Sequence, residues 1–417
     1  MQQITAEIIS IGHELLYGQT LDTNVHWLCA ALTQIGTKVT QTTTVGDEEE
    51  AILGALSAAK KRAAIIITTG GLGPTQDDLT KQALARYLNN TLVHYRQAGT
   101  DVRHTSQAGR DAPPSANSFP PAGLAHSSSI ANKLGTVPGV WLAKEDKVLI
   151  ALPGVPHEME QMMQDTVLPR LRKSFDLPAI YHKTIHTIGI TEPQLAAVIK
   201  PWAAALPSHI RLAYLPALGT VRLRLTAMGP HLIQLKQQVL AQVRQLQPWA
   251  APYIYGYDED TLEEVVGSTL QVHGKTLAIA ESCSGGYASH LITRVPGSSA
   301  YYKGGIIPYQ STAKQELLGI PAAMLAQHGT VSSTTAIAMA QGVRAKFQAA
   351  IGLASTGVAG PGGSSATTPV GTVWIALADA QGSCAEQLRL GSHRGHNIQL
   401  TALYLLNLLR RSLIQAP

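Results

Sequence analysis

The sequence of 417 residues lacks the features that mark exported, cysteine-ligated or disordered proteins. Its three cysteines, Cys29, Cys283 and Cys384, lie far apart and form no CxxC pair, so neither a disulfide framework nor a cysteine-based metal site is expected. Charged residues make up only 14% of the chain and hydrophobic residues 45%. This balance excludes a disordered chain and favours a sizeable core.

Long apolar runs and basic runs are also missing from the sequence. No stretch approaches the roughly 20 apolar residues that a membrane-spanning helix needs, and the N-terminus carries Glu7 and Glu14 where a signal peptide is basic. The formal net charge is +5, but lysine and arginine are scattered, and no basic run is interleaved with aromatics. We therefore expect a cytoplasmic protein that contacts neither a membrane nor nucleic acid directly.

What the chain does contain is an alternation of strand-like and helix-like segments. In its first part, β-branched runs such as AEIISIG and AAIIITTGGLG alternate with amphipathic segments such as DEEEAILGALSAAKKR. This alternation predicts an α/β fold, a doubly wound parallel sheet covered by helices. Residues 93–131 interrupt it, because their Ser, Ala, Pro and Gly content is typical of a flexible loop.

Changes in the pattern predict three domains. Residues 1–170 form the doubly wound α/β domain, residues 171–256 a small α+β linker domain, and residues 257–417 a second α/β domain. In the third domain the strand KTLAIA leads into ESCSGG and then into the helix YASHLITRV.

Hydroxyl and glycine residues gather at this strand-to-helix turn, AESCSGG, at 280–286. Such a turn holds a side chain above the sheet edge, and the amides at the helix start can bind a phosphate or stabilise an oxyanion. Gly285 and Gly286 let a ligand approach the backbone closely. The alternative is an ordinary capping turn, since Ser and Gly are common cap residues.

A base for a serine nucleophile stands in the same domain, in GGIIPYQSTAKQELLG. This segment places Tyr309 and Lys314 at another strand-to-helix transition, where a partly buried lysine can lose its proton near neutral pH. Ser–Lys pairs are a known variant of triad chemistry. The alternative is a solvated lysine in the first turn of a helix. A second glycine loop, at 355–371, has amides that can form an anion-binding nest.

A further glycine loop, TTGGLGPTQDDLT at 68–80, lies in the first domain. Gly70, Gly71 and Gly73 can cradle a phosphate, and Asp77 and Asp78 can hold a divalent cation that bridges it. The loop has neither the GK[ST] ending of a P-loop nor the GxGxxG spacing. The alternative is a helix start whose acidic residues interact favourably with the helix dipole.

In this order, TTGGLGPTQDDLT, PGVPHEM, AESCSGG and GVAGPGG resemble the motifs of the CinA (competence/damage-inducible protein A) family over nearly the whole chain. The resemblance implies a first domain similar to the MoaB/MogA-type molybdopterin-binding fold. It implies a last domain similar to PncC, the nicotinamide mononucleotide (NMN) amidohydrolase, which releases nicotinate mononucleotide and ammonia without a metal. Some members also cleave ADP-ribose at the first domain with a metal ion. Members of the family look like dimers, so the resemblance also implies a homodimer.

The resemblance also implies roles for individual residues. The expected catalytic residues are Ser282, Lys314 and Tyr309. Together with the glycine loops, it gives as expected substrate-binding residues Ser284, Gly285, Gly286, Thr356, Gly357, Gly360 and Arg394. A second nucleotide site in the first domain is expected to contain Glu14, Asn24, Gly70, Gly71, Gly73, Thr75, Asp77 and Asp78, with Asp77 and Asp78 as its candidate ligands for a divalent metal.

The sequence departs from the family pattern at several positions. Ser284 stands where threonine is usual, His393 where aspartate is usual, and Ile398 where a second arginine is often found. His13 stands in the GHELL turn where a small or acidic residue is usual, and residues 93–131 replace a basic stretch. We therefore expect a weak or inactive first site, in which His13 crowds or repels a metal.

The resemblance leads to the expectation of an NMN amidohydrolase of pyridine nucleotide salvage that needs no cofactor. Neutral Lys314 takes the proton of Ser282, and Ser282 attacks the carboxamide carbon of a small-molecule nucleotide. Cys283 is expected to point away from the site. The alternatives are a metal-dependent ADP-ribose pyrophosphatase at the first domain and a non-enzymatic pterin- or partner-binding protein linked to competence.

Overall fold

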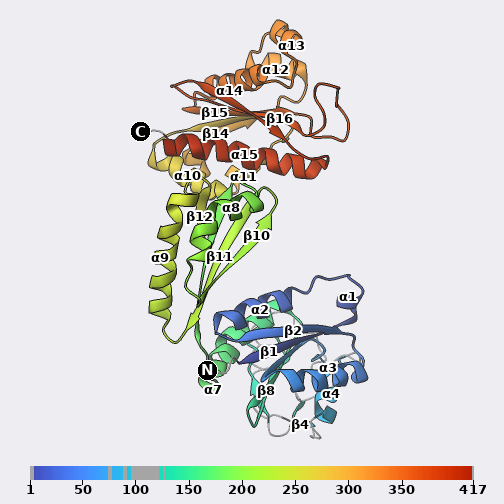
Figure 1. The fold of residues 1–417 in the computed structure, drawn as a ribbon. Coiled ribbons are helices and arrows are strands. Elements are labelled where there is room, and N and C mark those ends of the chain that lie inside the picture. The colour runs from blue at the N-terminus through green and yellow to red at the C-terminus, as the bar shows by residue number, and fades with distance from the viewer. Residues whose placement is uncertain (1–3, 74–77, 88–91, 95–121, 125–126, 416–417) are drawn as a thin grey trace. The chain divides into compact units, whose positions relative to one another are not determined.

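The computed structural model describes residues 4–73, 78–87, 92–94, 122–124 and 127–415. The chain divides into two compact units, Met1–Tyr181 with Ala227–Lys236, and His182–Thr226 with Gln237–Pro417 (Figure 1). The sequence predicts three domains, but the linker and the C-terminal domain fall largely into the same compact unit. The two units are described separately below.

The first unit contains a six-stranded sheet in the order β2-β1-β3-β8-β7-β6. Its strands are β1 (Thr5–Ile11), β2 (Lys38–Val45), β3 (Ile65–Thr69), β6 (Ser128–Ile130), β7 (Gly139–Lys144) and β8 (Lys147–Leu152). β2, β1, β3 and β8 are parallel, as the alternation of segments predicts, and β7 and β6 extend the sheet with antiparallel pairs.

Helices cover both faces of this sheet, which confirms the doubly wound prediction. The helices are α1 (His13–Leu16), α2 (Thr23–Gln34), α3 (Glu49–Arg62), α4 (Thr80–Tyr87), α6 (Pro156–Met162), the π-helix η1 (Met163–Val167) and α7 (Leu168–Ser174). Leu28 of α2 and Met159 of α6 pack with Ile8 on one face, and Ile52 of α3 packs with Ile9 on the other. The predicted boundary after residue 170 falls inside α7, whose Leu171 is fully buried in this core.

Most of the predicted loop at 93–131 lies outside the described residues. Within it, Ala122–Leu124 forms β5, which pairs with β4 (Leu92–His94), and β6 pairs with β7. The prediction of a flexible loop is therefore wrong for these short strands. Backbone pairing with neighbouring strands orders them, and a reading of local composition does not detect such pairing.

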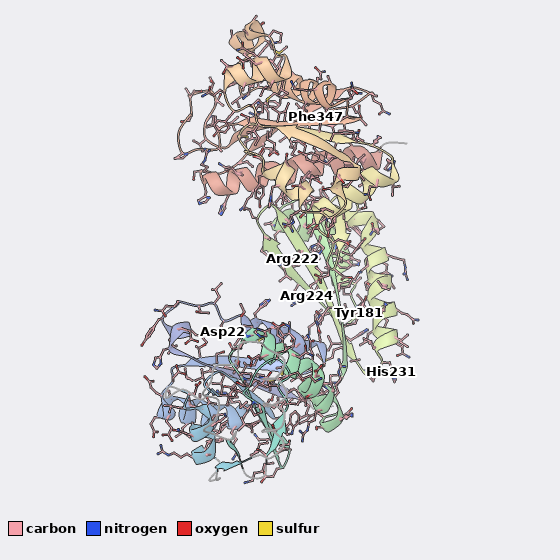
Figure 2. The ribbon with its side chains drawn as sticks, turned by 180° about the vertical axis from the view of Figure 1, so that it is seen from behind. Asp22, Tyr181, Arg222, Arg224, His231 and Phe347 are labelled. Atoms are coloured by element: carbon pink, nitrogen blue, oxygen red, sulfur yellow. The ribbon has the colours of Figure 1, made fainter. Side chains whose placement is uncertain are left out.

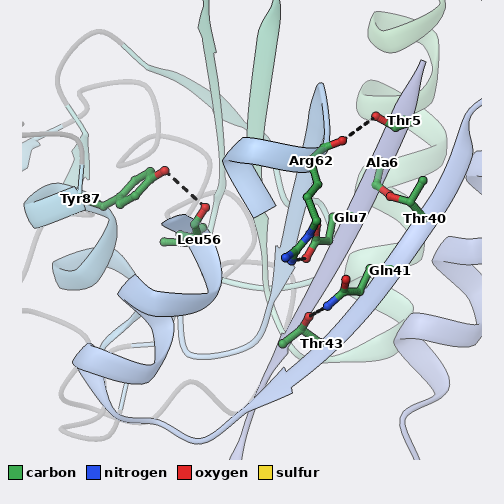
Figure 3. A network of polar contacts seen from close by, with 9 residues as sticks. All are labelled: Thr5, Ala6, Glu7, Thr40, Gln41, Thr43, Leu56, Arg62 and Tyr87. Atoms are coloured by element: carbon green, nitrogen blue, oxygen red, sulfur yellow. Dashed lines mark hydrogen bonds and ion pairs between the residues drawn. The ribbon is translucent and has the colours of Figure 1, made fainter. Parts of the chain in front are cut away.

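An ion pair between a buried glutamate and a partly exposed arginine fastens α3 to β1 in this unit (Figure 3). Glu7 on β1 is fully buried, and Arg62 at the end of α3 donates to both of its carboxylate oxygens, with Nε to Oε2 at 3.1 Å. The hydroxyl of Thr5 donates to the backbone carbonyl of Arg62 at 3.2 Å. Loss of Arg62 would leave a buried carboxylate without its cation, so the role of this pair is structural.

The linker is a small α+β module, as predicted. Its four-stranded sheet has the order β10-β11-β9-β12. Its elements are β9 (Ala179–Ile188), α8 (Glu192–Ala204), β10 (Ile210–Ala217), β11 (Thr220–Gly229), α9 (Leu232–Ala250) and β12 (Ile254–Tyr257). On β11, Leu223 is buried between Arg222 and Arg224, which are exposed and share the opposite face of the strand (Figure 2).

The C-terminal domain contains a five-stranded sheet in the order β14-β13-β15-β16-β17. Its strands are β13 (Leu277–Glu281), β14 (Tyr302–Ile306), β15 (Ile351–Gly357), β16 (Thr372–Ala378) and β17 (Ser383–Arg389). β14, β13 and β15 are parallel, whereas β16 and β17 are antiparallel additions. The parallel part puts the ends of β13, β14 and β15 at one edge of the sheet.

Helices cover both faces of this sheet too. They are α10 (Leu262–Val272), α11 (Tyr287–Thr293), the 3-10 turn η2 (Ser298–Ala300), α12 (Ser311–Leu318), α13 (Ala322–His328), α14 (Ser333–Phe347) and α15 (Arg394–Gln415). α10, α11 and α15 contribute to one core, which includes Val266, Leu291 and Leu405. Met339 of α14 lies in the core of the other face with Leu325 of α13.

Buried polar contacts explain why the linker and the C-terminal domain share one unit. Arg410 of α15 is buried and donates to the carbonyls of Ile254 (2.9 Å) and Pro252 (2.8 Å). Ile188 of β9 belongs to the same core as α10 and α15. Among the described residues, no helix combines the length and apolar character that crossing a bilayer requires.

Candidate active site

The strongest candidate site lies where β13, β14 and β15 end at the same edge of the C-terminal sheet. α/β proteins bind ligands outside the carboxyl ends of such parallel strands. A cavity of about 590 Å³ opens here. It is lined from three directions: by the turn after β13, by the segment that starts α12, and by the glycine loop after β15. Sequence segments some 70 residues apart therefore meet in one place.

Ser282 and Lys314 face each other in this cavity. Lys314 Nζ lies 3.1 Å from Ser282 Oγ and donates to the carbonyl of Pro308 at 2.8 Å. The lysine is only 2% exposed, so the alternative of a solvated lysine is wrong. Burial lowers the pKa of Lys314 below its ordinary value, because a charged ammonium loses its hydration. Among the described residues, no acid forms an ion pair with it.

Cys283, the neighbour of Ser282, is poorly suited to attack. Its side chain is 6% exposed and belongs to a hydrophobic core, but the residue also lines the cavity, so the expectation that Cys283 points away from the site is not confirmed. Burial raises the pKa of the Cys283 thiol to about 11. A thiol reacts as its thiolate, which is scarce at neutral pH with such a pKa. Ser282 is therefore the better placed nucleophile of the two.

The turn after Ser282 makes its hydrogen bonds inward. Gly286 N donates to the buried carboxylate of Glu281 at 3.2 Å, and Gly285 N donates to the carbonyl of Ser282 at 3.2 Å. Ser284 is 2% exposed, and its hydroxyl bonds to Glu281 and Ser355, each at 2.7 Å. The cavity lining includes none of Ser284, Gly285 and Gly286, so the geometry does not support the substrate contacts expected of them.

A further part of the wall is formed by the glycine loop and the start of α15, and it carries a positive charge. Thr356, Gly357 and Gly360 line the cavity, as expected. Arg394 also lines it; its guanidinium donates to the carbonyl of Gly360 at 2.6 Å and to the hydroxyl of Tyr309 at 3.0 Å. Tyr309 thus reaches the cavity, but its hydroxyl bonds to Arg394 and not to the Ser282–Lys314 pair.

Other residues of the GSHRGHNI segment serve the structure. Asn397 is buried and donates to the carbonyls of Ala359 (3.0 Å) and Gly391 (2.9 Å), which fixes the glycine loop. His393 Nδ1 accepts from the amide of His396 at 3.2 Å at the start of α15. Ile398 packs against the core. Sequence reasoning missed Asn397 and Glu281, since a single Asn or Glu carries no distinctive pattern.

A second cavity, of about 520 Å³, lies in the first unit at the ends of β1, β3 and β8. The expected Gly70, Gly71 and Gly73 line it. Gly70 and Gly71 have φ values of 110° and 62°, a backbone conformation that favours glycine. Among the described residues of the wall, those that carry charge are acidic: Glu14, Asp47, Asp78 and Glu158.

The remaining expected residues of this site are only partly brought together. Asn24 lines a neighbouring cavity of about 120 Å³, which Glu14 also lines, and donates to the carbonyl of Gly154 at 2.8 Å. Thr75 and Asp77 lie outside the described residues. Within the described part of the chain, no group of three or more His, Cys, Asp or Glu side chains is arranged to hold a metal ion.

His13 does not enter either cavity, contrary to the expected crowding of a metal. Its ring nitrogens lie 3.1 Å from the carboxylate of Asp47 and 3.3 Å from that of Glu48. The hydrogen bond to Glu48, with the nearby Asp47, raises the pKa of His13. The acidic residues of the following loop turn the imidazole away, and the GHELL motif alone gives no sign of them.

Comparisons with known protein families match three successive parts of the chain. Residues 259–413 match the model of the CinA C-terminal domain, residues 7–173 that of the probable molybdopterin binding domain, and residues 182–256 that of the damage-inducible protein CinA KH domain.

Relatives match the whole chain. A CinA-like protein of Amoebophilus asiaticus is 49% identical over 98% of this chain and 99% of its own length. Another from Cytophaga hutchinsonii is 42% identical over 98% of each chain. Among solved structures, competence/damage inducible protein CihA from Agrobacterium tumefaciens is 34% identical, covers 37% of this chain and 94% of its own, and has a TM-score of 0.36.

Proposed function

Because the chain belongs to the CinA family, whose C-terminal domain holds the Ser282–Lys314 pair, we propose that it hydrolyses the carboxamide of NMN at the C-terminal cavity. The observation that carries this proposal is the 3.1 Å approach of a buried lysine amine to a serine hydroxyl. A neutral lysine so placed is a base for its serine neighbour. The products are nicotinate mononucleotide and ammonia.

The size and charge of the cavity suit a mononucleotide. Its volume of about 590 Å³ lies within the roughly 300–1,000 Å³ of small-molecule sites. Arg394 lines the cavity, and guanidinium groups bind phosphate through charge-assisted hydrogen bonds. We assign the phosphate to Arg394, which Tyr309 and Gly360 orient, and the carboxamide to Ser282. Tyr309 thus acts on the substrate's phosphate end.

In the first half of the reaction, neutral Lys314 Nζ takes the proton of Ser282 Oγ while Oγ bonds to the carboxamide carbon. The carbonyl electron pair moves to the carboxamide oxygen, which becomes an oxyanion. The protonated Lys314 then gives its proton to the leaving nitrogen, the C–N bond breaks, and ammonia departs. The positively charged pyridinium ring withdraws electrons and makes the carbon easier to attack. An ester on Ser282 remains.

In the second half, water attacks the ester carbon and Lys314 takes a proton from the water. This proton returns to Ser282 Oγ as the C–O bond to the serine breaks, and nicotinate mononucleotide leaves. Lys314 is neutral again at the end of the cycle. All four proton transfers pass through Lys314 Nζ, and two of them run along its contact with Ser282 Oγ, which explains why the lysine must be both close to the serine and poorly hydrated.

The test is to incubate the purified protein with NMN in EDTA and to measure ammonia and nicotinate mononucleotide. The proposal expects equal amounts of the two products, and it expects Ser282→Ala to lower kcat by roughly 10⁴-fold or more. Activity that needs added zinc or magnesium, or that survives in Ser282→Ala, would overturn the proposal.

A further inference from the structure

A carboxylate that the proposed mechanism does not use lies directly before the nucleophile. Glu281 ends β13 and is fully buried. Its Oε2 accepts from the hydroxyl of Ser284 (2.7 Å) and from the amides of Gly286 (3.2 Å) and Ala288 (3.0 Å). Its Oε1 accepts from the amide (2.8 Å) and the hydroxyl (2.6 Å) of Ser289. One side chain thus gathers the donors at the start of α11.

These contacts extend from Glu281 to the other wall of the cavity. The hydroxyl of Ser284 lies 2.7 Å from that of Ser355 on β15, and Ser282 N donates to the carbonyl of Ser355 at 3.0 Å. β15 itself includes Thr356 and Gly357 and continues directly into the glycine loop. One buried hydrogen-bond network therefore joins the turn that bears Ser282 to the glycine loop after β15.

The network also decides what the start of α11 can bind. Glu281 occupies the amides of Gly286 and Ala288, and a carboxylate is the group that a helix N-terminus favours. A substrate anion there would meet this buried negative charge. The start of α11 is thus internally neutralised, and the cationic Arg394 in the cavity lining remains for an anionic substrate group.

We propose that Glu281 is the positioning residue of the active site: its carboxylate holds the turn so that Ser282 Oγ points at Lys314 Nζ. This inference rests on the proposed amidase function and deepens it. A misplacement of about 1 Å can cost roughly 100-fold in rate, so small movements of the turn matter. Glu281 touches no substrate atom in this account; it acts through Ser282.

Glutamine at position 281 tests this role because it keeps the size and shape of the side chain. Its NH₂ group replaces an acceptor by a donor and faces the N–H and O–H donors that now bond to Glu281. We expect Glu281→Gln to lower kcat for NMN roughly 100-fold with KM changed less than about threefold. The matched control is Glu263→Gln, a buried carboxylate of the same domain that pairs with Arg294 and does not line the cavity. It should keep kcat within about twofold.

A second readout is independent of the substrate. A fluorophosphonate probe bonds to an activated serine with loss of fluoride, and mass spectrometry counts labelled Ser282. In Glu281→Gln, the labelling rate should fall by about the same factor as kcat. The circular dichroism spectrum of the variant should stay near-native. If the wild type labels but does not hydrolyse NMN, the amidase proposal fails while the labelling rates still decide the role of Glu281.

Glu281→Gln that retains kcat and labelling within about threefold would overturn the positioning role. If this variant does not fold, Ser284→Ala decides instead, because it removes only the hydroxyl between Glu281 and Ser355. We then expect about a tenfold loss of kcat at constant KM. An unchanged kcat contradicts the proposal, and so does a raised KM with unchanged kcat, which would make Ser284 a substrate contact.

Discussion

The two cavities lie at equivalent edges of two α/β sheets, yet they are built for different chemistry. The C-terminal cavity carries a serine against a buried lysine, and an arginine also lines it. Among the described residues, those that carry charge in the N-terminal cavity are the acidic Glu14, Asp47, Asp78 and Glu158. A nucleotide phosphate is attracted by the first wall and repelled by the second unless a cation intervenes. The same fold class thus gives sites of opposite charge.

After Ser282, the contrast depends most on Lys314, and exchanging this lysine should have the next largest effect. Lys314→Arg and Lys314→Ala should each lower kcat for NMN by about 10²–10⁴-fold, because arginine keeps the charge but cannot serve as a base. Steady-state ammonia release measures both. An arginine variant with near-normal kcat would show that position 314 supplies only positive charge.

The pH dependence of the wild type belongs to the same prediction. Burial lowers the pKa of Lys314, so its neutral form is populated above a pKa that lies below the ordinary lysine value. We expect kcat/KM to fall as the pH drops through this lowered pKa and to level off above it. A profile that instead rises toward acid pH would mean that protonated Lys314 is the active form.

Replacing Arg394 tests whether this arginine binds the phosphate of the substrate. Arg394→Ala should raise KM for NMN about tenfold and change kcat less, because a charge-assisted hydrogen bond to phosphate of roughly 1.5 kcal/mol is lost. Arg389→Ala is the matched control, since Arg389 is an exposed arginine of the same domain outside the cavity lining. Equal KM values for the two variants would show that Arg394 does not bind the phosphate.

The choice of nucleophile predicts a much smaller effect. Cys283→Ala should keep kcat within about threefold, because its buried thiol has a raised pKa and packs in the core. Its melting temperature should drop, since a buried side chain becomes smaller. A loss of activity in a variant that remains folded at the assay temperature would reassign the attack to the cysteine.

The acidic cavity should contribute nothing to amide hydrolysis. Asp78→Ala should leave ammonia release from NMN unchanged, and the wild type should release little AMP from ADP-ribose with magnesium or manganese. The described residues offer no set of three convergent metal ligands there, and correct positioning is decisive for rate. Robust AMP release that disappears in Asp78→Ala would give the protein two working active sites.

Much of the fold follows from the sequence, because β-branched runs and amphipathic helices predict the doubly wound sheet of the first unit and the α/β character of the C-terminal domain. The antiparallel strand β6 was missed, since its pairing with β7 is set by tertiary contacts. Ser282, Lys314 and Arg394 were identified through motifs. The inward hydrogen bonds of Ser284 and the role of Glu281 were not, because glycine-rich turns look alike whether their amides face a ligand or a neighbouring carboxylate.

The central claim, that Ser282 and Lys314 form an acyl-transfer site, is tested most directly by trapping the intermediate. NMN is mixed with the enzyme in EDTA, the reaction is quenched with acid within the first turnovers, and the active-site peptide is analysed by mass spectrometry. The account predicts a nicotinate mononucleotide acyl group on Ser282 that is lost in Ser282→Ala. An acyl group on Cys283, or full turnover by Ser282→Ala, would contradict it.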